Sequence, residues 1–170
     1  MKYFLTILGI LASIPLIVYG IGSFMPQSHT VSQQQTFDVP QQELWQLISD
    51  IKSYPDWRPY VDSVKVLSDS TEALRWREYY READSLPFEV VSSNDSSKFI
   101  TKIADADLPF GGTWTYAIDS TAAGTQLSIT ENGEVYSPIY RFISSVFVGY
   151  DTTIKQYFND LERRINYLNK

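Results

Sequence analysis

The sequence predicts an α+β domain in which a curved antiparallel sheet of about seven strands wraps around one long C-terminal helix, with a transmembrane helix in front of it. Three observations carry this prediction. Apolar residues recur at steps of three and four after Ser137, as on one helix face. Between Ser63 and Val135 the period is two, as in strands. The stretch Tyr3–Met25 contains no charged residue.

The C-terminal segment is predicted to form a single helix over residues 138–168. Ser137 and Pro138 supply an N-cap and a first-turn proline. At about 1.5 Å per residue, the helix would be on the order of 45 Å long. An apolar helix face of that length must pack against a wide surface, which the predicted sheet provides. Gly149 lies within the segment and indicates either a bend or a close contact.

Composition and charge exclude several classes of function. The net charge of −6 opposes nucleic-acid binding, which depends on basic residues that neutralise phosphates. The chain has no cysteine and a single histidine, His29. Disulfides, thiolate nucleophiles and Cys-based or His-rich metal sites are therefore not expected. We expect no cofactor. The 12 Tyr, 9 Phe and 4 Trp residues favour a core or cavity lined by aromatic rings.

Residues 1–27 are predicted to be a membrane anchor and its tether. The 23 uncharged residues of Tyr3–Met25 are long enough to span a bilayer. A cleaved signal peptide is the alternative, with a small-x-small site at Gly20–Gly22. The run is long for a signal peptide and has no Ala-x-Ala site, which favours a retained single-pass anchor. Lys2 and the positive-inside rule place the domain on the non-cytoplasmic side. His29, close to the anchor, is expected to be a solvated tether residue.

Residues 28–170 are predicted to be one domain. A first strand is expected near Val31–Phe37, followed by a helix over Gln41–Ile51. The two prolines between Ser53 and Tyr60 limit that stretch to a short helical turn, which presents Trp57. The further predicted strands, separated by polar or Gly-containing turns, are Ser63–Leu67, Leu74–Tyr80, Phe88–Ser92, Phe99–Ala104, Thr113–Asp119 and Thr125–Val135.

Several short motifs resemble those of a known family. They are Phe37–Pro40, the turn Tyr54-Pro55-x-Trp57-x-Pro59, the hairpin Pro109–Tyr116, the strand Thr130–Val135 and the terminal helix. Over roughly residues 30–168 the chain is similar to START-like (SRPBCC) domains, in particular the polyketide cyclase/dehydrase-like group. The resemblance implies a helix-grip fold with an apolar cavity between the sheet and the terminal helix. It implies no particular reaction.

Two glutamates are candidates for acid–base chemistry. Glu131 shares a strand face with Leu127 and Ile129, and Glu78 shares one with Trp76, so both carboxylates should point inward. A carboxylate in an apolar cavity can serve as a general acid or base. The alternative is structural, with water or arginine satisfying both groups at the strand ends. A bulge at Asn132–Gly133 would shift the alternation of inward and outward side chains, and the inward orientation of Glu131 depends on that alternation.

A set of aromatic residues is expected to line a ligand cavity, since apolar aromatic clefts with a few polar groups are typical small-molecule sites. Core packing is the alternative for each single member. The candidates are Trp57, Tyr60, Trp76, Phe88, Trp114, Tyr116 and Tyr140.

The first turns of the terminal helix carry more apolar surface than one face needs. Tyr140 and Val148 flank the stripe between Ile139 and Phe147. Such a helix contacts lipid, a partner or a covering loop such as Leu108–Phe110.

Three functions follow from these observations. The first is non-catalytic binding of an apolar or amphipathic small molecule, such as a lipid, by a membrane-anchored domain. The second is a cyclase, dehydratase or isomerase that uses Glu131 or Glu78. The third is an adaptor in a membrane complex, which docks a protein partner on the surface of residues 139–148.

Overall fold

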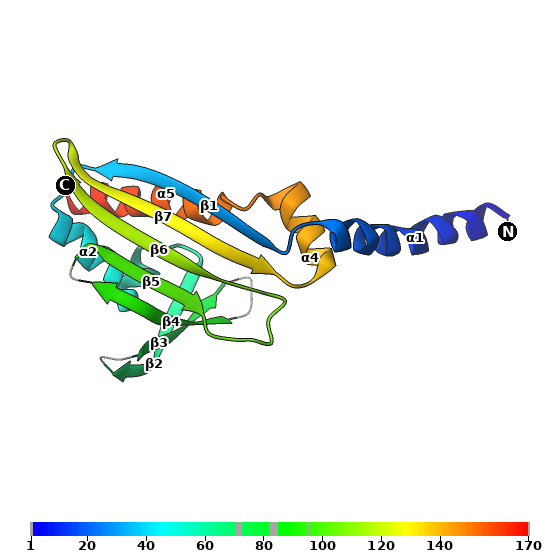
Figure 1. Ribbon diagram of the computed structural model, residues 1–170, viewed down its shortest axis with the longest axis horizontal. Coiled ribbons are helices and arrows are strands. Elements are labelled where there is room, and N and C mark those ends of the chain that lie inside the picture. Colours follow the sequence, from blue (N-terminus) through cyan, green and yellow to red (C-terminus); the bar gives the residue numbers. More distant parts are fainter. Residues whose placement is uncertain (1, 71–72, 82–84, 95, 170) are drawn as a thin grey trace.

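One strongly curved antiparallel sheet dominates the computed structural model, which describes residues 2–70, 73–81, 85–94 and 96–169, with the side chains of residues 2, 5–11, 70 and 73 left out (Figure 1). In this described part, seven strands follow the order β1-β7-β6-β5-β4-β3-β2. Their bounds are β1 Ser28–Phe37, β2 Val61–Ser70, β3 Ala73–Tyr80, β4 Ser85–Asn94, β5 Lys98–Ile103, β6 Phe110–Thr121 and β7 Gly124–Val135. Each predicted strand is present and begins one to three residues earlier than expected.

The helices lie at the two ends of the sheet and across its inner face. Helix α1 projects away from the domain, and α5 runs along the sheet (Figure 1). Their bounds, with two short non-α turns η1 and η2, are α1 Lys2–Phe24, α2 Gln41–Ser49, η1 Ile51–Ser53, α3 Tyr54–Trp57, α4 Pro138–Ile143, η2 Ser144–Val148 and α5 Thr152–Leu168.

No helix is long and apolar enough for a membrane span among the residues whose side chains are described. The anchor predicted over Tyr3–Met25 includes residues 5–11, which lie outside that set.

The single terminal helix predicted over residues 138–168 is wrong. The segment consists of α4, the π-helical turn η2 and, after a break, α5. Gly149 ends η2 with φ 79° and ψ 140°, a conformation that only glycine adopts without strain. The apolar spacing continues across this break, because each piece keeps an apolar face of its own. In Figure 1, α4 lies at the base of α1, away from the inner face that α5 covers.

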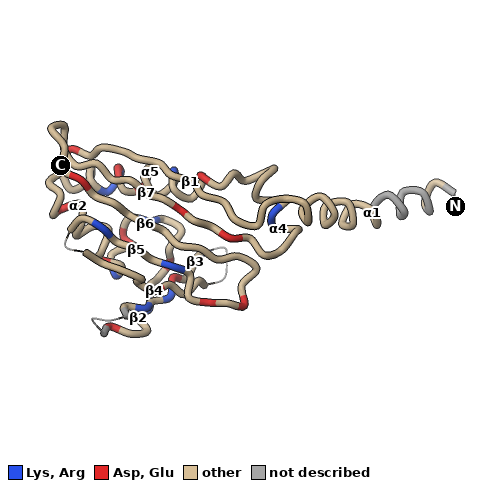
Figure 2. The backbone as a smooth tube through the Cα atoms, in the orientation of Figure 1, with Lys and Arg blue, Asp and Glu red and all other residues tan. Residues whose placement is uncertain are grey.

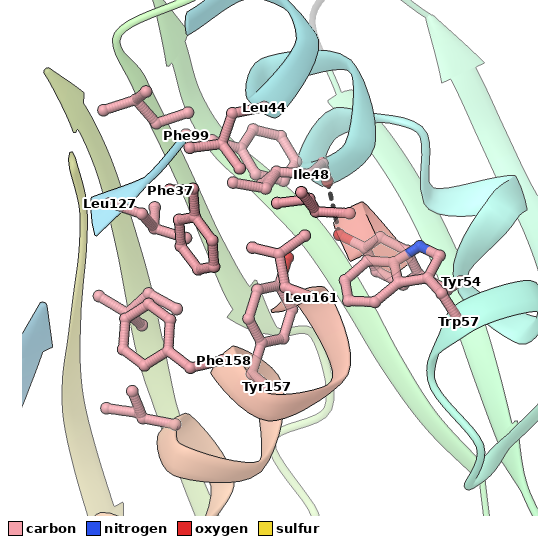
Figure 3. Close-up of a cluster of buried hydrophobic side chains, with 14 of the residues drawn as sticks. Phe37, Leu44, Ile48, Tyr54, Trp57, Phe99, Leu127, Tyr157, Phe158 and Leu161 are labelled. Carbon is pink, nitrogen blue, oxygen red and sulfur yellow. Dashed lines mark hydrogen bonds between the residues drawn. The ribbon is translucent and has the colours of Figure 1, made fainter. Parts of the chain in front are cut away.

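The core forms where α5 and α2 pack on the concave face of the sheet. Leu161, Leu44 and Leu127 are fully buried, and the Phe37 and Phe158 rings lie 6.2 Å apart. Figure 3 shows these side chains converging from the sheet, α2 and α5. The amphipathic pattern of α5 is therefore satisfied by the sheet, as the sequence predicts.

Strand β7 keeps a regular register through the residues that could have formed a bulge. It pairs with β6 from Thr121↔Gly124 to Phe110↔Val135 without a shift, including Gly112↔Gly133. The bulge considered at Asn132–Gly133 is therefore absent, and the alternation of inward and outward side chains extends to Glu131.

Candidate ligand cavity

A cavity of about 380 Å³ lies between the concave face of the sheet and the C-terminal segment. Strands β3 to β7 provide its wall, and α4, η2 and α5 provide its cover. Its volume lies within the range of about 300–1,000 Å³ that is typical of small-molecule sites. Most of its lining is apolar, with two groups of polar side chains that contain the two candidate glutamates.

The apolar wall is largely aromatic. Trp76 of β3 stacks on Phe88 of β4 with ring centroids 5.5 Å apart, and Phe88 meets Trp114 of β6 edge to face at 6.2 Å. Tyr116 and Tyr140 also line the cavity. These five residues belong to the aromatic set that was expected to line a ligand cavity.

Two predicted lining residues, Trp57 and Tyr60, do not line the cavity. Trp57 is buried in the core, where it packs edge to face against Tyr54 and Tyr157 at 5.5 and 5.3 Å. The Tyr60 hydroxyl donates a hydrogen bond of 2.5 Å to the buried carboxylate of Asp160 on α5. The proline-flanked turn therefore places both side chains in contact with α5 instead of the cavity.

Glu78 lies in a dense polar group beside Arg58, where the buried Tyr54 and Tyr157 also line the cavity; this part of the site is called here the closed end. The Glu78 side chain is 2% exposed, and its Oε1 accepts hydrogen bonds from Arg58 Nη1 and Trp76 Nε1, both at 3.1 Å. The Tyr80 hydroxyl donates to Oε2 at 2.9 Å. The inward orientation expected for Glu78 is found, and three donors hold the carboxylate in place, as burial of a charge requires.

Arg58 also contacts two further tyrosines. Its guanidinium carbon lies 4.7 Å from the Tyr54 ring centroid and 5.6 Å from that of Tyr157, within cation–π range. Burial raises the pKa of Tyr54, Tyr157 and Tyr116 above the ordinary value for tyrosine. These hydroxyls therefore stay neutral at physiological pH and can donate or accept hydrogen bonds at the closed end.

Glu131 lies at the opposite end, beneath the turn that follows η2. Its Oε2 accepts hydrogen bonds from Trp114 Nε1 at 3.0 Å and Thr153 Oγ1 at 3.2 Å, and its Oε1 lies 3.3 Å from His29 Nε2. The His29 ring also stacks on Tyr150, with centroids 3.8 Å apart. Glu131 thus faces the cavity as predicted and is held by groups from β1, β6 and α5.

His29 is a site residue that the sequence analysis missed. The expectation that it is solvated in a tether is wrong, because β1 begins at Ser28 and its side chain is only 14% exposed. His29 pairs with Gly133 across the strands, and a Cβ at that glycine would collide with the imidazole ring. Within the described part of the chain, His29 Nδ1 is buried and has no hydrogen-bond partner. The sequence signal for this placement was that His29 lies two residues before Val31, since residues two apart in a strand face the same side.

A curved sheet gripping a C-terminal helix around an apolar cavity defines the helix-grip class of small-molecule-binding domains. A family model described as "Polyketide cyclase / dehydrase and lipid transport" matches residues 28–155. The chain belongs to this family. No curated protein sequence matches it.

Solved structures support the fold. The Zhui aromatase/cyclase from Streptomyces sp. R1128 aligns with a TM-score of 0.68 at 12% identity, over 84% of this chain and 96% of that one. A START superfamily protein from Mycobacterium smegmatis aligns with a TM-score of 0.63 at 19% identity, over 82% and 99%. Norcoclaurine synthase from Thalictrum flavum aligns with a TM-score of 0.64 at 8% identity, over 81% and 86%. At these identities the similarity shows the fold alone.

Proposed function

We propose that this protein binds an apolar or amphipathic small molecule, of which a lipid is one example, without converting it, and that a membrane anchor keeps it beside the bilayer. The observation that carries the proposal is the cavity of about 380 Å³, walled by Trp76, Phe88 and Trp114. Burial of an apolar ligand there contributes about 25 cal/mol per Å² before the costs of association.

Polar groups at both ends of the cavity suit a ligand with an apolar body and a polar end. At the closed end, Arg58 Nε is buried without a partner among the described residues, and the Arg58 guanidinium lies over the rings of Tyr54 and Tyr157. Because an unpaired buried donor costs free energy, a ligand oxygen placed there would gain affinity.

The anchor is the second part of the proposal. Helix α1 spans the 23 residues Lys2–Phe24, and no charged residue follows Lys2 within it. At about 1.5 Å per residue this length matches a hydrocarbon core of about 30 Å. Lys2 favours a cytoplasmic N-terminus, which would place the cavity on the non-cytoplasmic side. Carbonate extraction of membranes, together with the intact mass of the protein, distinguishes an anchor from a cleaved signal peptide.

Extraction of bound molecules tests the binding function. Full-length protein is purified in amphipol, extracted with organic solvent and compared by mass spectrometry with two variants. Ile103→Trp fills the cavity wall, whereas Leu67→Trp adds the same ring at a position that is 49% exposed and outside the cavity. We expect an apolar compound in the wild type and in Leu67→Trp, and its loss in Ile103→Trp. Identical extracts from all three proteins would contradict ligand binding.

The enzymatic alternative rests on the pairing of Glu131 with His29 at the cavity wall. A carboxylate–imidazole pair beside an apolar cavity can move a proton to or from a bound substrate. The test is turnover of the extracted compound by the wild type and by the double variant Glu131→Gln/Glu78→Gln. Product formed by the wild type and lost in the double variant would favour a cyclase, dehydratase or isomerase.

A further inference from the structure

The segment from Ser137 to Tyr150, called here the mouth segment, has an unusual surface. None of the described residues of α4 and η2 is buried. Arg141 is the only charged residue in the segment. Its exposed apolar side chains range from 40% to 74% exposure and are Ile139, Tyr140, Ile143, Val146, Phe147 and Val148. An uncharged apolar surface of this kind indicates a contact with lipid or with a partner.

The mouth segment is fastened directly to the end of α1. Gly22 is buried against Pro138 so closely that a Cβ at Gly22 would collide with the Pro138 carbonyl. Arg141 Nη1 donates a hydrogen bond of 2.9 Å to the backbone oxygen of Met25, and Nη2 donates to that of Tyr136 at 3.2 Å. The one charge of the segment is therefore turned toward backbone carbonyls at the helix junction. The apolar surface keeps a fixed position relative to α1.

This position coincides with the level of the lipid headgroups if α1 spans the bilayer. A span that begins near Tyr3 crosses about 30 Å after roughly 20 residues, which is close to Gly22, where Pro138 packs. Arg141 is the only charged residue among Pro138–Ile143 of α4, and Figure 2 shows the colour of Lys and Arg where the described part of α1 meets α4. Tyr19, Tyr136 and Tyr140 are exposed around the junction, and tyrosine is enriched at membrane interfaces.

The same segment also covers the cavity. Tyr140, Ser144, Val148 and Tyr150 line it from the side of α4, η2 and the following turn. Tyr140 and Val148 both line the cavity and belong to the exposed apolar surface, so the cavity borders that surface. An opening beside this segment would face the bilayer to which α1 holds it.

From these contacts we infer that the mouth segment lies in the membrane interface, with Val146 and Phe147 in contact with lipid, and that the cavity exchanges its ligand directly with the bilayer. This inference rests on the proposed anchor. Apolar area supplies the attraction, as in other interfacial helices, and no basic surface is needed.

The absence of cysteine from the chain permits a direct test with single labels. Val146→Cys and, as a matched control, Val91→Cys are labelled with the environment-sensitive dye NBD in full-length protein reconstituted into phosphatidylcholine liposomes. The two valines are 54% and 53% exposed, and Val91 lies on β4, four strands from β1 in the sheet. We expect a blue-shifted emission at position 146 that spin-labelled lipids quench, and a water-like, unquenched emission at position 91.

Three other outcomes would overturn the inference in distinguishable ways. A water-like emission at position 146 in a protein that resists carbonate extraction would refute the interfacial position and leave the anchor in place. Loss of the protein from the membrane on carbonate extraction would refute the anchor, and the inference with it. A blue-shifted emission at position 146 that spin-labelled lipids do not quench would show that a protein covers the surface instead.

A second variant tests whether the contact serves the ligand. Phe147 is 74% exposed, so Phe147→Asp changes the surface without disturbing the core. Transfer of a fluorescent fatty acid, used as the probe, from liposomes to full-length Phe147→Asp should be slower than to the wild type, with the same amount bound at equilibrium. Equal rates would contradict exchange through the bilayer.

Discussion

The two ends of the cavity differ in what holds them together. The closed end combines the buried face of α5 with the Arg58–Glu78 pair, and Glu78, Tyr54 and Tyr157 are buried there. The mouth end combines α4 and η2, which have no buried residue in the part of the chain that is described, with the His29–Tyr150 stack. The difference indicates that the closed end supplies more of the stability than the mouth end, where we propose that the ligand exchanges.

The largest effect is expected from removing the charge of Arg58 at the closed end. Arg58→Met leaves Glu78, which is 2% exposed, as an uncompensated buried carboxylate, and should destabilise the fold by about 3–5 kcal/mol. Urea unfolding of the full-length protein in detergent, followed by tryptophan fluorescence, measures this. The double variant Arg58→Met/Glu78→Gln should recover part of the loss. A cost below about 1 kcal/mol for the single variant would show that the pair is not structural.

Truncating one apolar side chain in α5 and one in η2 compares directly how much each end of the cavity contributes to stability. Leu161→Ala on α5 removes a fully buried side chain and should cost about 2–5 kcal/mol in the free energy of unfolding. Phe147→Ala in η2, at 74% exposure, should stay within about 0.5 kcal/mol of the wild type. Equal costs for both variants would mean that the mouth end is packed as well as the closed end.

These two residues also show the limit of the sequence prediction. Leu161 and Phe147 belong to one continuous apolar spacing, and nothing in that spacing tells which part the sheet covers. The break depends on the φ of 79° at Gly149, which the sequence indicated only as a bend or a close contact. The alternation of side chains along β7 is more informative than this helical spacing, because it correctly predicted that Leu127, Ile129 and Glu131 point inward.

The residues of the candidate site were also predicted only in part. Trp76 and Trp114 were expected to line a cavity as members of an aromatic set, and both line it. Trp57 lies in a proline-flanked turn without a period, so its direction depends on tertiary packing against Tyr157. His29 was missed because its partners, Glu131 and Tyr150, are distant in sequence and meet it only through the register of β1 on β7.

The break at Gly149, between η2 and α5, is expected to give an intermediate effect on stability. Gly149→Ala places a side chain at φ 79° and should cost about 1–3 kcal/mol, because only glycine adopts this conformation without strain. Gly20→Ala, with no atom within 4 Å of the added Cβ, is the matched control and should be neutral or slightly stabilising. Thermal unfolding by circular dichroism compares the two. No difference between them would show that the mouth segment can reorganise freely.

The smallest effect is expected at the mouth itself. A double-mutant cycle of His29→Ala and Tyr150→Ala should give a coupling free energy of about 0.5–1.5 kcal/mol from their stacked rings. Urea unfolding of the four proteins in detergent measures it. Zero coupling would mean that the stack does not hold the turn over Glu131.

Saturable binding of an amphipathic probe tests the central claim most directly. Full-length protein in nanodiscs is titrated with the fluorescent probe 1-anilinonaphthalene-8-sulfonate, alongside Ile103→Trp and Leu67→Trp. The account predicts one saturable site in the wild type and in Leu67→Trp, displaced by a lipid extract, and its loss when the Trp ring fills the cavity at position 103. Probe uptake that is identical in all three proteins and never saturates would contradict a ligand cavity.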